Sequence, residues 1–142
     1  MNRTLARFSV AAISMAALVA ATSTGSAYAA TGAAGCSISS ASGGATFTNW
    51  TSSHVDIQGM NVYDLAADGH HVAIRLWSYG AKGSASHAWP WHHNYAGKDT
   101  SIIFNTTASN AYGPLTHLGV EVATMEGSTI ISYCLDWAPA LS

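Results

Sequence analysis

Apolar and polar residues alternate in short stretches along most of this chain, a pattern typical of half-buried β-strands. The clearest stretch is 72–77, where valine, isoleucine and leucine alternate with alanine, arginine and tryptophan. Similar stretches predict further strands at 46–50, 55–65, 89–95, 101–107, 118–123 and 131–137. With no convincing helix after residue 29, this spacing predicts an all-β fold: a single antiparallel β-sandwich of about seven strands over residues 45–142.

Local breaks in the alternation predict how these strands are bent and joined. The apolar phase slips at Gln58-Gly59, which indicates a β-bulge. Asp68-Gly69 and Glu126-Gly127 are typical two-residue turns. We therefore expect one hairpin around residue 69 and a second around residue 127.

The first 29 residues have the order of a secretory signal peptide. Arg3 and Arg7 precede an apolar run at 8–21, and the small-x-small triplet 27–29 follows a polar stretch. The run is shorter than the roughly 20 residues that a membrane span needs. We expect cleavage after Ala29 and a secreted, extracellular protein with no part in a membrane.

Residues 30–44 consist almost entirely of glycine, alanine, serine and threonine. Such tracts are flexible unless something holds them. We therefore expect a flexible N-terminal arm that Cys36 ties to the domain at 45–142.

Two cysteines follow the predicted cleavage point, Cys36 and Cys134, and an even number in an exported protein predicts a disulfide bond. The segment 33–36 faintly resembles a lipobox, which would make Cys36 a lipidated first residue. The apolar run ends far upstream, at Ala21, and lipidation would leave Cys134 unpaired. The disulfide is therefore the favoured hypothesis.

The net charge of the chain after residue 29 argues against two classes of partner, nucleic acids and anionic membranes. After residue 29 the chain keeps three cations, Arg75, Lys82 and Lys98, against seven acids, a formal charge of −4 with neutral histidines. Binding of nucleic acid needs clustered lysine and arginine, and anionic membranes attract the same residues. Neither is expected as a partner.

The seven histidines raise the question of a metal site. Neighbours on a strand point to opposite faces, so His70-His71 and His92-His93 cannot each chelate an ion from one strand. A site built across loops from His87, His92 and Asp99 is the alternative. We predict no metal and no cofactor.

Motifs of catalysis are missing from the sequence: it has no G-x-S-x-G and no H-E-x-x-H, and the disulfide leaves no free thiol. Asp56 and Glu121 lie on predicted strands and could form a glycosidase-like pair, although any β-protein with seven acids offers such a pair by chance. We therefore predict no catalytic residues and a protein that is not an enzyme.

The segment 89–95, WPWHHNY, holds the densest group of rings. If it is extended, the period of two places Trp89, Trp91, His93 and Tyr95 on one face, while Pro90 limits it to an edge or a loop. One hypothesis is an exposed aromatic strip that binds a protein or a sugar. The other is that most of these rings pack on the core as a lid.

A resemblance to known proteins lies in the segment from Val62 to Arg75, VYDLAADGHHVAIR. Behind this kind of signal peptide, it resembles the small secreted β-sandwich proteins of filamentous actinobacteria, in which a V-x-D-x-x-A-D-G-H-x-V-x-V-R-like hairpin recurs and most members have no assigned function. The size of the chain is also similar to that of the small subunit of umbrella toxin particles, and the small-residue tract at 30–44 would suit a strand or arm that inserts into a larger partner. That resemblance implies an adaptor joining a toxin-bearing chain to a lectin-bearing one.

Together these observations give three functional hypotheses, of which a hydrolase or metalloprotein is the last. The first is a secreted, non-enzymatic β-sandwich that binds another, larger secreted protein, as the adaptor of an extracellular antibacterial complex. The second is a carbohydrate-binding module that uses Trp89, Trp91, His93 and Tyr95 on a polysaccharide.

Overall fold

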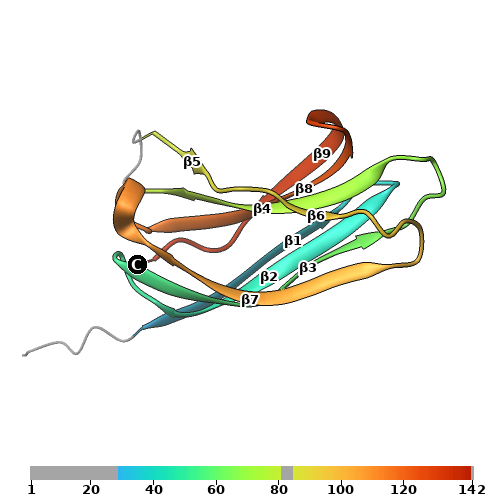
Figure 1. Cartoon of the computed structure of the whole chain (residues 1–142). Coiled ribbons are helices and arrows are strands. Elements are labelled where there is room, and N and C mark those ends of the chain that lie inside the picture. Colours follow the sequence, from blue (N-terminus) through green and yellow to red (C-terminus); the bar gives the residue numbers. More distant parts are fainter. Residues whose placement is uncertain (1–28, 81–84, 142) are drawn as a thin grey trace, which may run out of the picture.

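The computed structural model describes residues 29–80 and 85–141, which form two antiparallel sheets packed face to face (Figure 1). Sheet A has the order β1-β2-β3-β7, with strands Ala30–Ser37, Ala41–Trp50, His54–Asp64 and Ser101–Ser109. Sheet B has the order β5-β4-β8-β9, with β6 also on β4; its strands are His87–Ala88, His71–Tyr79, His117–Glu126, Thr129–Trp137 and His92–Asn94. A short 3-10 helix, Asn110–Tyr112, follows β7. The predicted all-β sandwich is confirmed.

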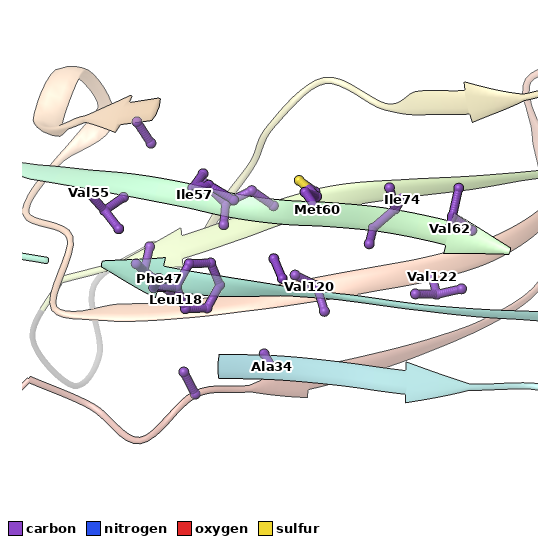
Figure 2. Packing of buried hydrophobic residues seen from close by; sticks show 14 of the residues in the cluster. Ala34, Phe47, Val55, Ile57, Met60, Val62, Ile74, Leu118, Val120 and Val122 are labelled. Carbon is purple, nitrogen blue, oxygen red and sulfur yellow. The ribbon is translucent and has the colours of Figure 1, made fainter. Parts of the chain in front are cut away.

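The core lies between the sheets and comes from the alternating apolar positions. Sheet A contributes Phe47, Val55 and Ile57 among others, and sheet B contributes the inward residues of β4 and β8 (Figure 2). Trp50 is 1% exposed and its indole N–H donates to the Leu115 carbonyl at 2.6 Å. Each fully buried side chain of this size stabilises the fold by about 1.5–3 kcal/mol.

The predicted bulge is confirmed in β3. Pairing with β7 shifts between Ile57 and Met60, and Gly59 adopts a φ of 58° that favours glycine. The Gly59 N–H donates to Asn105 Oδ1 at 2.8 Å. The extra residue turns both Ile57 and Met60 toward the core, where each is 1% exposed.

The expectation of a flexible arm at residues 30–44 is wrong. Residues 30–37 form β1, which pairs with β2 from Ala30↔Trp50 to Ser37↔Ser42. The small side chains serve close packing here: a Cβ on Gly43 would lie 2.4 Å from the Asn61 carbonyl oxygen and 3.1 Å from a methyl group of Val122. Strand β1, and the short strand β5 that precedes the predicted stretch 89–95, raise the count from about seven strands to nine in the described ranges.

The hairpin predicted at Asp68-Gly69 is also wrong. Strand β3 pairs with β2 and β7, whereas β4 pairs with β5, β6 and β8, so residues 65–70 carry the chain from sheet A to sheet B. The turn chemistry itself is present, with Gly69 at a φ of 79° and the Asp68 carboxylate accepting from the His70 N–H at 3.0 Å. At Glu126-Gly127 the predicted hairpin is confirmed by the pairing of β8 with β9.

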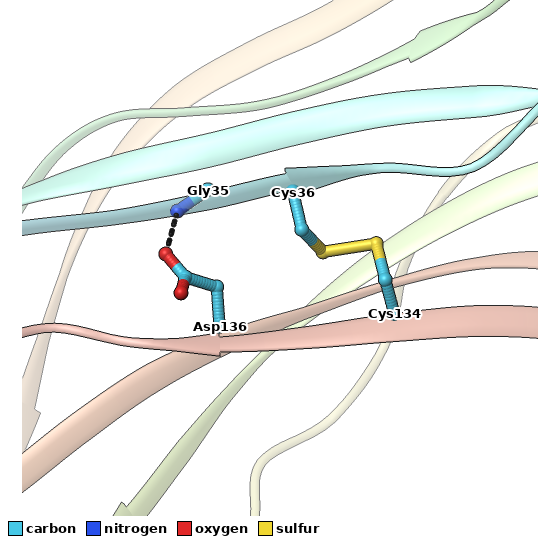
Figure 3. Close-up of a disulfide and its surroundings, with 4 residues drawn as sticks. All are labelled: Gly35, Cys36, Cys134 and Asp136. Carbon is cyan, nitrogen blue, oxygen red and sulfur yellow. Dashed lines mark hydrogen bonds between the residues drawn. A yellow bond between two sulfur atoms is a disulfide. The ribbon is translucent and has the colours of Figure 1, made fainter.

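One long side of the sandwich is covalently closed. Cys36 on β1 and Cys134 on β9, the edge strands of the two sheets, form the predicted disulfide across 98 positions of sequence (Figure 3). Beside it the Gly35 N–H donates to Asp136 Oδ2 at 2.9 Å. On the other side, β6 and β7 contact through side chains: the His92 and Phe104 rings lie 4.2 Å apart, and the Asn94 amide donates to the carbonyl of Thr100, just before β7, at 3.1 Å.

The predicted signal peptide lies outside the described residues, except for Ala29, and the predicted cleavage point directly precedes β1. Within the described ranges, the chain holds no helix long and apolar enough to cross a membrane.

Candidate binding face

Sheet B buries apolar side chains on both of its faces. Its inner face contributes to the main core, while Ala73, Ala123 and Met125 are buried in a separate cluster on the outer face, with Trp91 packed against them. An antiparallel sheet with one solvated face normally shows polar side chains there. Sheet A follows that rule: its outward positions include Thr46, Gln58, Asn105 and Thr107.

The outer face of sheet B is built around an ion pair. Arg75 on β4 lies opposite Glu121 on β8, and Arg75 Nε donates to Glu121 Oε2 at 2.6 Å. The Trp77 indole N–H donates to the same carboxylate oxygen. The glutamate side chain is only 4% exposed and that of the arginine 19%. Both charged groups are shielded from solvent on this outer face because aromatic rings lie over them.

Two indoles provide that cover. The guanidinium carbon of Arg75 lies 5.0 Å from the ring centroid of Trp77 and 4.2 Å from that of Trp91. Both distances fall within the range of cation–π attraction. The guanidinium, its carboxylate and both rings therefore form one ordered unit at the centre of the face.

Strand β9 extends this surface with exposed side chains. Tyr133 and Leu135, opposite Ala123 and Glu121, are 60% and 38% exposed. At the turn end of the strand, Ile130 and Ile131 are 37% and 52% exposed. We call the surface formed by Trp77, Trp91, Tyr133, Leu135 and Trp137 the aromatic face.

Trp137 occupies the end of the aromatic face over Gly119. A Cβ on this glycine would lie 2.7 and 2.9 Å from two atoms of the indole, so only glycine leaves room for the ring. The ring of Trp137 also meets that of Tyr79 edge-on at 5.0 Å, and Tyr79 stacks on His117 at 4.0 Å. The register between β8 and β9 therefore determines where this indole lies.

The four residues of the predicted aromatic strip do not form one row. Trp89 packs against the main core, and its indole N–H donates to Ser78 Oγ at 2.9 Å. Trp91 lies on the outer face, where His93 and Tyr95 lie near His71 with centroid distances of 5.1 and 4.4 Å. The chain at 89–91 is not a strand, so the period of two fails between Trp89 and Trp91. Whether Trp91, His93 and Tyr95 bind a partner stays a prediction.

A cavity of about 200 Å³ lies at the side of the sandwich opposite the disulfide. Its walls come from inward residues of β3 and β4, from the link between β5 and β6, and from β7: Ile57, Met60, Leu76, Trp89, Pro90, His92, Thr106 and Thr107. The cavity is small and mostly apolar. Among the described residues on its wall, His92 is the one with a titratable side chain. Burial and the neighbouring His93 lower the pKa of His92, which favours its neutral form.

The residues considered for chemistry are dispersed. Asp56 lies on sheet A and Glu121 on sheet B, so the glycosidase-like pair is not formed. Asp56 instead accepts from the Asn49 amide at 2.6 Å and contacts His54 at 2.9 Å, and these hydrogen bonds lower its pKa.

The loop-built metal site is not formed either. His87 stacks on Tyr112 at 3.7 Å, and His92 packs on Phe104. In the part of the chain that the structure describes, no group of three or more His, Cys, Asp or Glu side chains is arranged to hold a metal ion.

Sequence reasoning missed most of the aromatic face. Its signal is present, because the residues facing away from Val72, Ile74 and Leu76 include Trp77, and because 131–137 has apolar residues at every second position. Recognising this face requires knowing that Tyr133, Leu135 and Trp137 face outward, and the pairing of β9 with β8 sets that orientation.

Comparison of the chain with protein-family models, with curated proteins and with solved structures gives no match.

Proposed function

We propose that this chain is a secreted, non-enzymatic protein that binds another protein through the aromatic face. The observation that carries the proposal is the outer face of sheet B, where aromatic and aliphatic side chains surround one covered ion pair, whereas the outer face of sheet A is mostly polar. Tyr133 at 60% and Leu135 at 38% exposed stand beside a covered ion pair and two half-buried indoles. Contiguous apolar surface of this kind marks interaction sites on soluble proteins.

The composition of the aromatic face favours a protein partner. Tryptophan, tyrosine and arginine dominate the residues that contribute most to protein interfaces. The aliphatic side chains Ile131 and Leu135 lie next to Tyr133, and such side chains pack against apolar residues of a partner. Sugar recognition depends instead on free hydrogen-bonding groups beside the rings, and here Glu121 already accepts from both Arg75 and Trp77.

The ordered centre of the face supports tight binding. Arg75 and its two indoles are held by each other and by Glu121, so little side-chain entropy remains to be lost when a partner docks. In the form that the resemblance implies, the partner is a larger subunit of a secreted antibacterial complex, and this chain is its adaptor.

Affinity capture from the culture supernatant of the producing organism tests the proposal. The tagged full chain is compared with a Tyr133→Ser/Leu135→Ser variant and with Ile103→Ser, a matched control because Ile103 is 71% exposed on sheet A. We expect one defined secreted protein to co-purify with the wild type and with Ile103→Ser, and to be lost with the double variant. Recovery of the chain without a partner, or equal capture by all three, would contradict the proposal.

Export is tested separately by N-terminal sequencing of the protein from the supernatant. We expect the mature chain to begin at Ala30, directly after the small-x-small triplet at 27–29. A chain that stays inside the cell with Met1 in place would contradict this part.

A carbohydrate-binding module is the second candidate, favoured by the half-buried ring of Trp91 on an outer sheet face. Retention on insoluble chitin, cellulose and bacterial cell wall tests it. Trp91→Ala should then reduce retention, whereas Trp89→Ala should not, since Trp89 packs against the main core. Absence of retention on all three polymers contradicts this candidate.

A further inference from the structure

Two histidines from neighbouring strands face each other at the margin of sheet B. His71 on β4 and His93 on β6 lie diagonally across the ladder, and His71 Nε2 is 3.0 Å from His93 Nδ1. Both side chains are half-buried. The sequence argument against chelation considered neighbours on one strand and so missed a pair formed between strands.

The other five histidines make different contacts. His54 and His70 each meet a carboxylate, of Asp56 and Glu126. His87, His92 and His117 pack on rings of Tyr112, Phe104 and Tyr79. Among the described residues, His71 and His93 are therefore the pair whose ring nitrogens point at each other.

The separation of the two nitrogens matches that of neighbouring ligands of one metal ion. Imidazole nitrogens bind zinc at about 2.0–2.1 Å, and two of them at angles of 90–109° lie about 2.8–3.4 Å apart. The observed 3.0 Å falls inside this range. Because the two bonds together exceed this distance, the ion would lie beside the line that joins the nitrogens, and both rings would turn so that their lone pairs converge on it.

The surroundings of the pair suit a cation. Glu126 lies close enough to act electrostatically on His71, and its carboxylate also contacts His70 Nδ1 at 2.6 Å. The ring of Tyr95 lies over both imidazoles, at 4.4 and 5.3 Å. Desolvation and the proximity of His93 lower the pKa of His71, which keeps the ring in the neutral form that metals require.

We infer that His71 and His93 form a two-histidine site for a divalent transition-metal ion, with copper(II) bound more tightly than zinc. Neutral imidazole is a ligand for both ions, and at a given site copper(II) binds more strongly. In the metal-free pair one of the two facing nitrogens carries a proton. On binding, that proton moves to the other nitrogen of the same ring. Both rings stay neutral, and each facing nitrogen then has a free lone pair that binds the ion. This inference is independent of the proposed protein partner.

Titration of the metal-free full chain with copper(II), followed by calorimetry and electron paramagnetic resonance at pH 7.5, tests the inference. We expect one equivalent to bind with hyperfine coupling to two imidazole nitrogens, and zinc to bind more weakly. His71→Ala and His93→Ala should each weaken copper binding at least about tenfold. His92→Ala is the matched control, because His92 adjoins His93 but packs on Phe104, and it should bind like the wild type.

Thermal unfolding of each variant, followed by circular dichroism, separates loss of the site from loss of the fold. A variant that unfolds is replaced by His71→Gln or His93→Gln, which keep a polar side chain but remove the imidazole. Copper binding that is equal in the wild type and both single variants, or a spectrum without two coupled nitrogens, would overturn the inference.

Discussion

Arg75 and Glu121 lie opposite each other on β4 and β8, joined at 2.6 Å on the outer face of a sheet and covered by the indoles of Trp77 and Trp91. Covered ion pairs are costly to form, because both charges lose water, and they are more costly to break. The pair therefore gives a sharp test of how well the aromatic face is ordered.

Removing only the cation should destabilise the fold. Arg75→Met leaves the carboxylate of Glu121 covered and unpaired, and we expect the free energy of unfolding to fall by about 3 kcal/mol in urea at pH 7. Arg75→Met combined with Glu121→Leu should recover most of that loss, because no charge is left covered. A double variant no more stable than Arg75→Met would show that the indoles do not shield the carboxylate.

The disulfide should contribute the largest single stabilisation. It links Cys36 to Cys134 across 98 positions, and the chain-entropy model assigns such a loop about 4–5 kcal/mol. We expect Cys36→Ala/Cys134→Ala to lose about this much in chemical unfolding. As control, Asp136→Asn, which weakens only the acceptor for the Gly35 N–H beside the disulfide, should cost about 1 kcal/mol. Equal losses in the two variants would contradict the assignment.

Gly119→Ala should displace the ring of Trp137. The added methyl group meets the indole at 2.7 Å and the Asp136 carbonyl oxygen at 2.6 Å, so we expect about 1–3 kcal/mol of destabilisation and a shifted Trp137 indole resonance in NMR spectra. Gly127→Ala, at a φ of 58° with open space around it, should also destabilise but leave that resonance in place. An unmoved indole in Gly119→Ala would contradict the close contact.

Asp56 should titrate below its ordinary pKa of 3.8, chiefly because the Asn49 amide donates to it and secondly because of His54. A lowered folded-state pKa means that the carboxylate adds stability above pH 3.8, which is lost as the pH falls through the folded-state value. Asn49→Gly removes the donor and suits the φ of 49° at this position. We expect it to raise the pKa of Asp56 more than His54→Ala does, measured by carboxyl carbon chemical shifts. The reverse order would contradict this account.

Strand interiors and the disulfide were predictable from the sequence, because alternation at 72–77 and 118–123 and the Cys36–Cys134 pairing each have one simple physical solution. The connections between the strands were not predictable from the sequence. Asp68-Gly69 forms a turn in either topology, and only the packing of the sheets decides that the next strand joins sheet B. Small residues at 30–44 suit a linker and a closely packed strand equally well. The structure shows the second, because a Cβ added at Gly43 would collide with the neighbouring strand.

The candidate site was only partly predictable, for a related reason. Period-two reasoning places Trp91, His93 and Tyr95 together, but Pro90 interrupts the strand and leaves Trp89 on the core side. The contact between His71 and His93 depends on the pairing of β4 with β6, which joins residues 22 positions apart. Strand partners and registers are set by tertiary packing, so a single-strand pattern does not contain them.

The closure of one long side of the sandwich has a mechanical consequence. The disulfide of Cys36 and Cys134 joins the edge strands of the two sheets covalently at one margin. At the opposite margin the sheets meet through the link from β6 to β7, the packing of His92 on Phe104 and the hydrogen bonds from the Asn94 amide to Thr100. We therefore expect the sheets to separate more readily at that margin, where the cavity lies. We expect an opening at that margin to expose the walls of the cavity to solvent before the rest of the core.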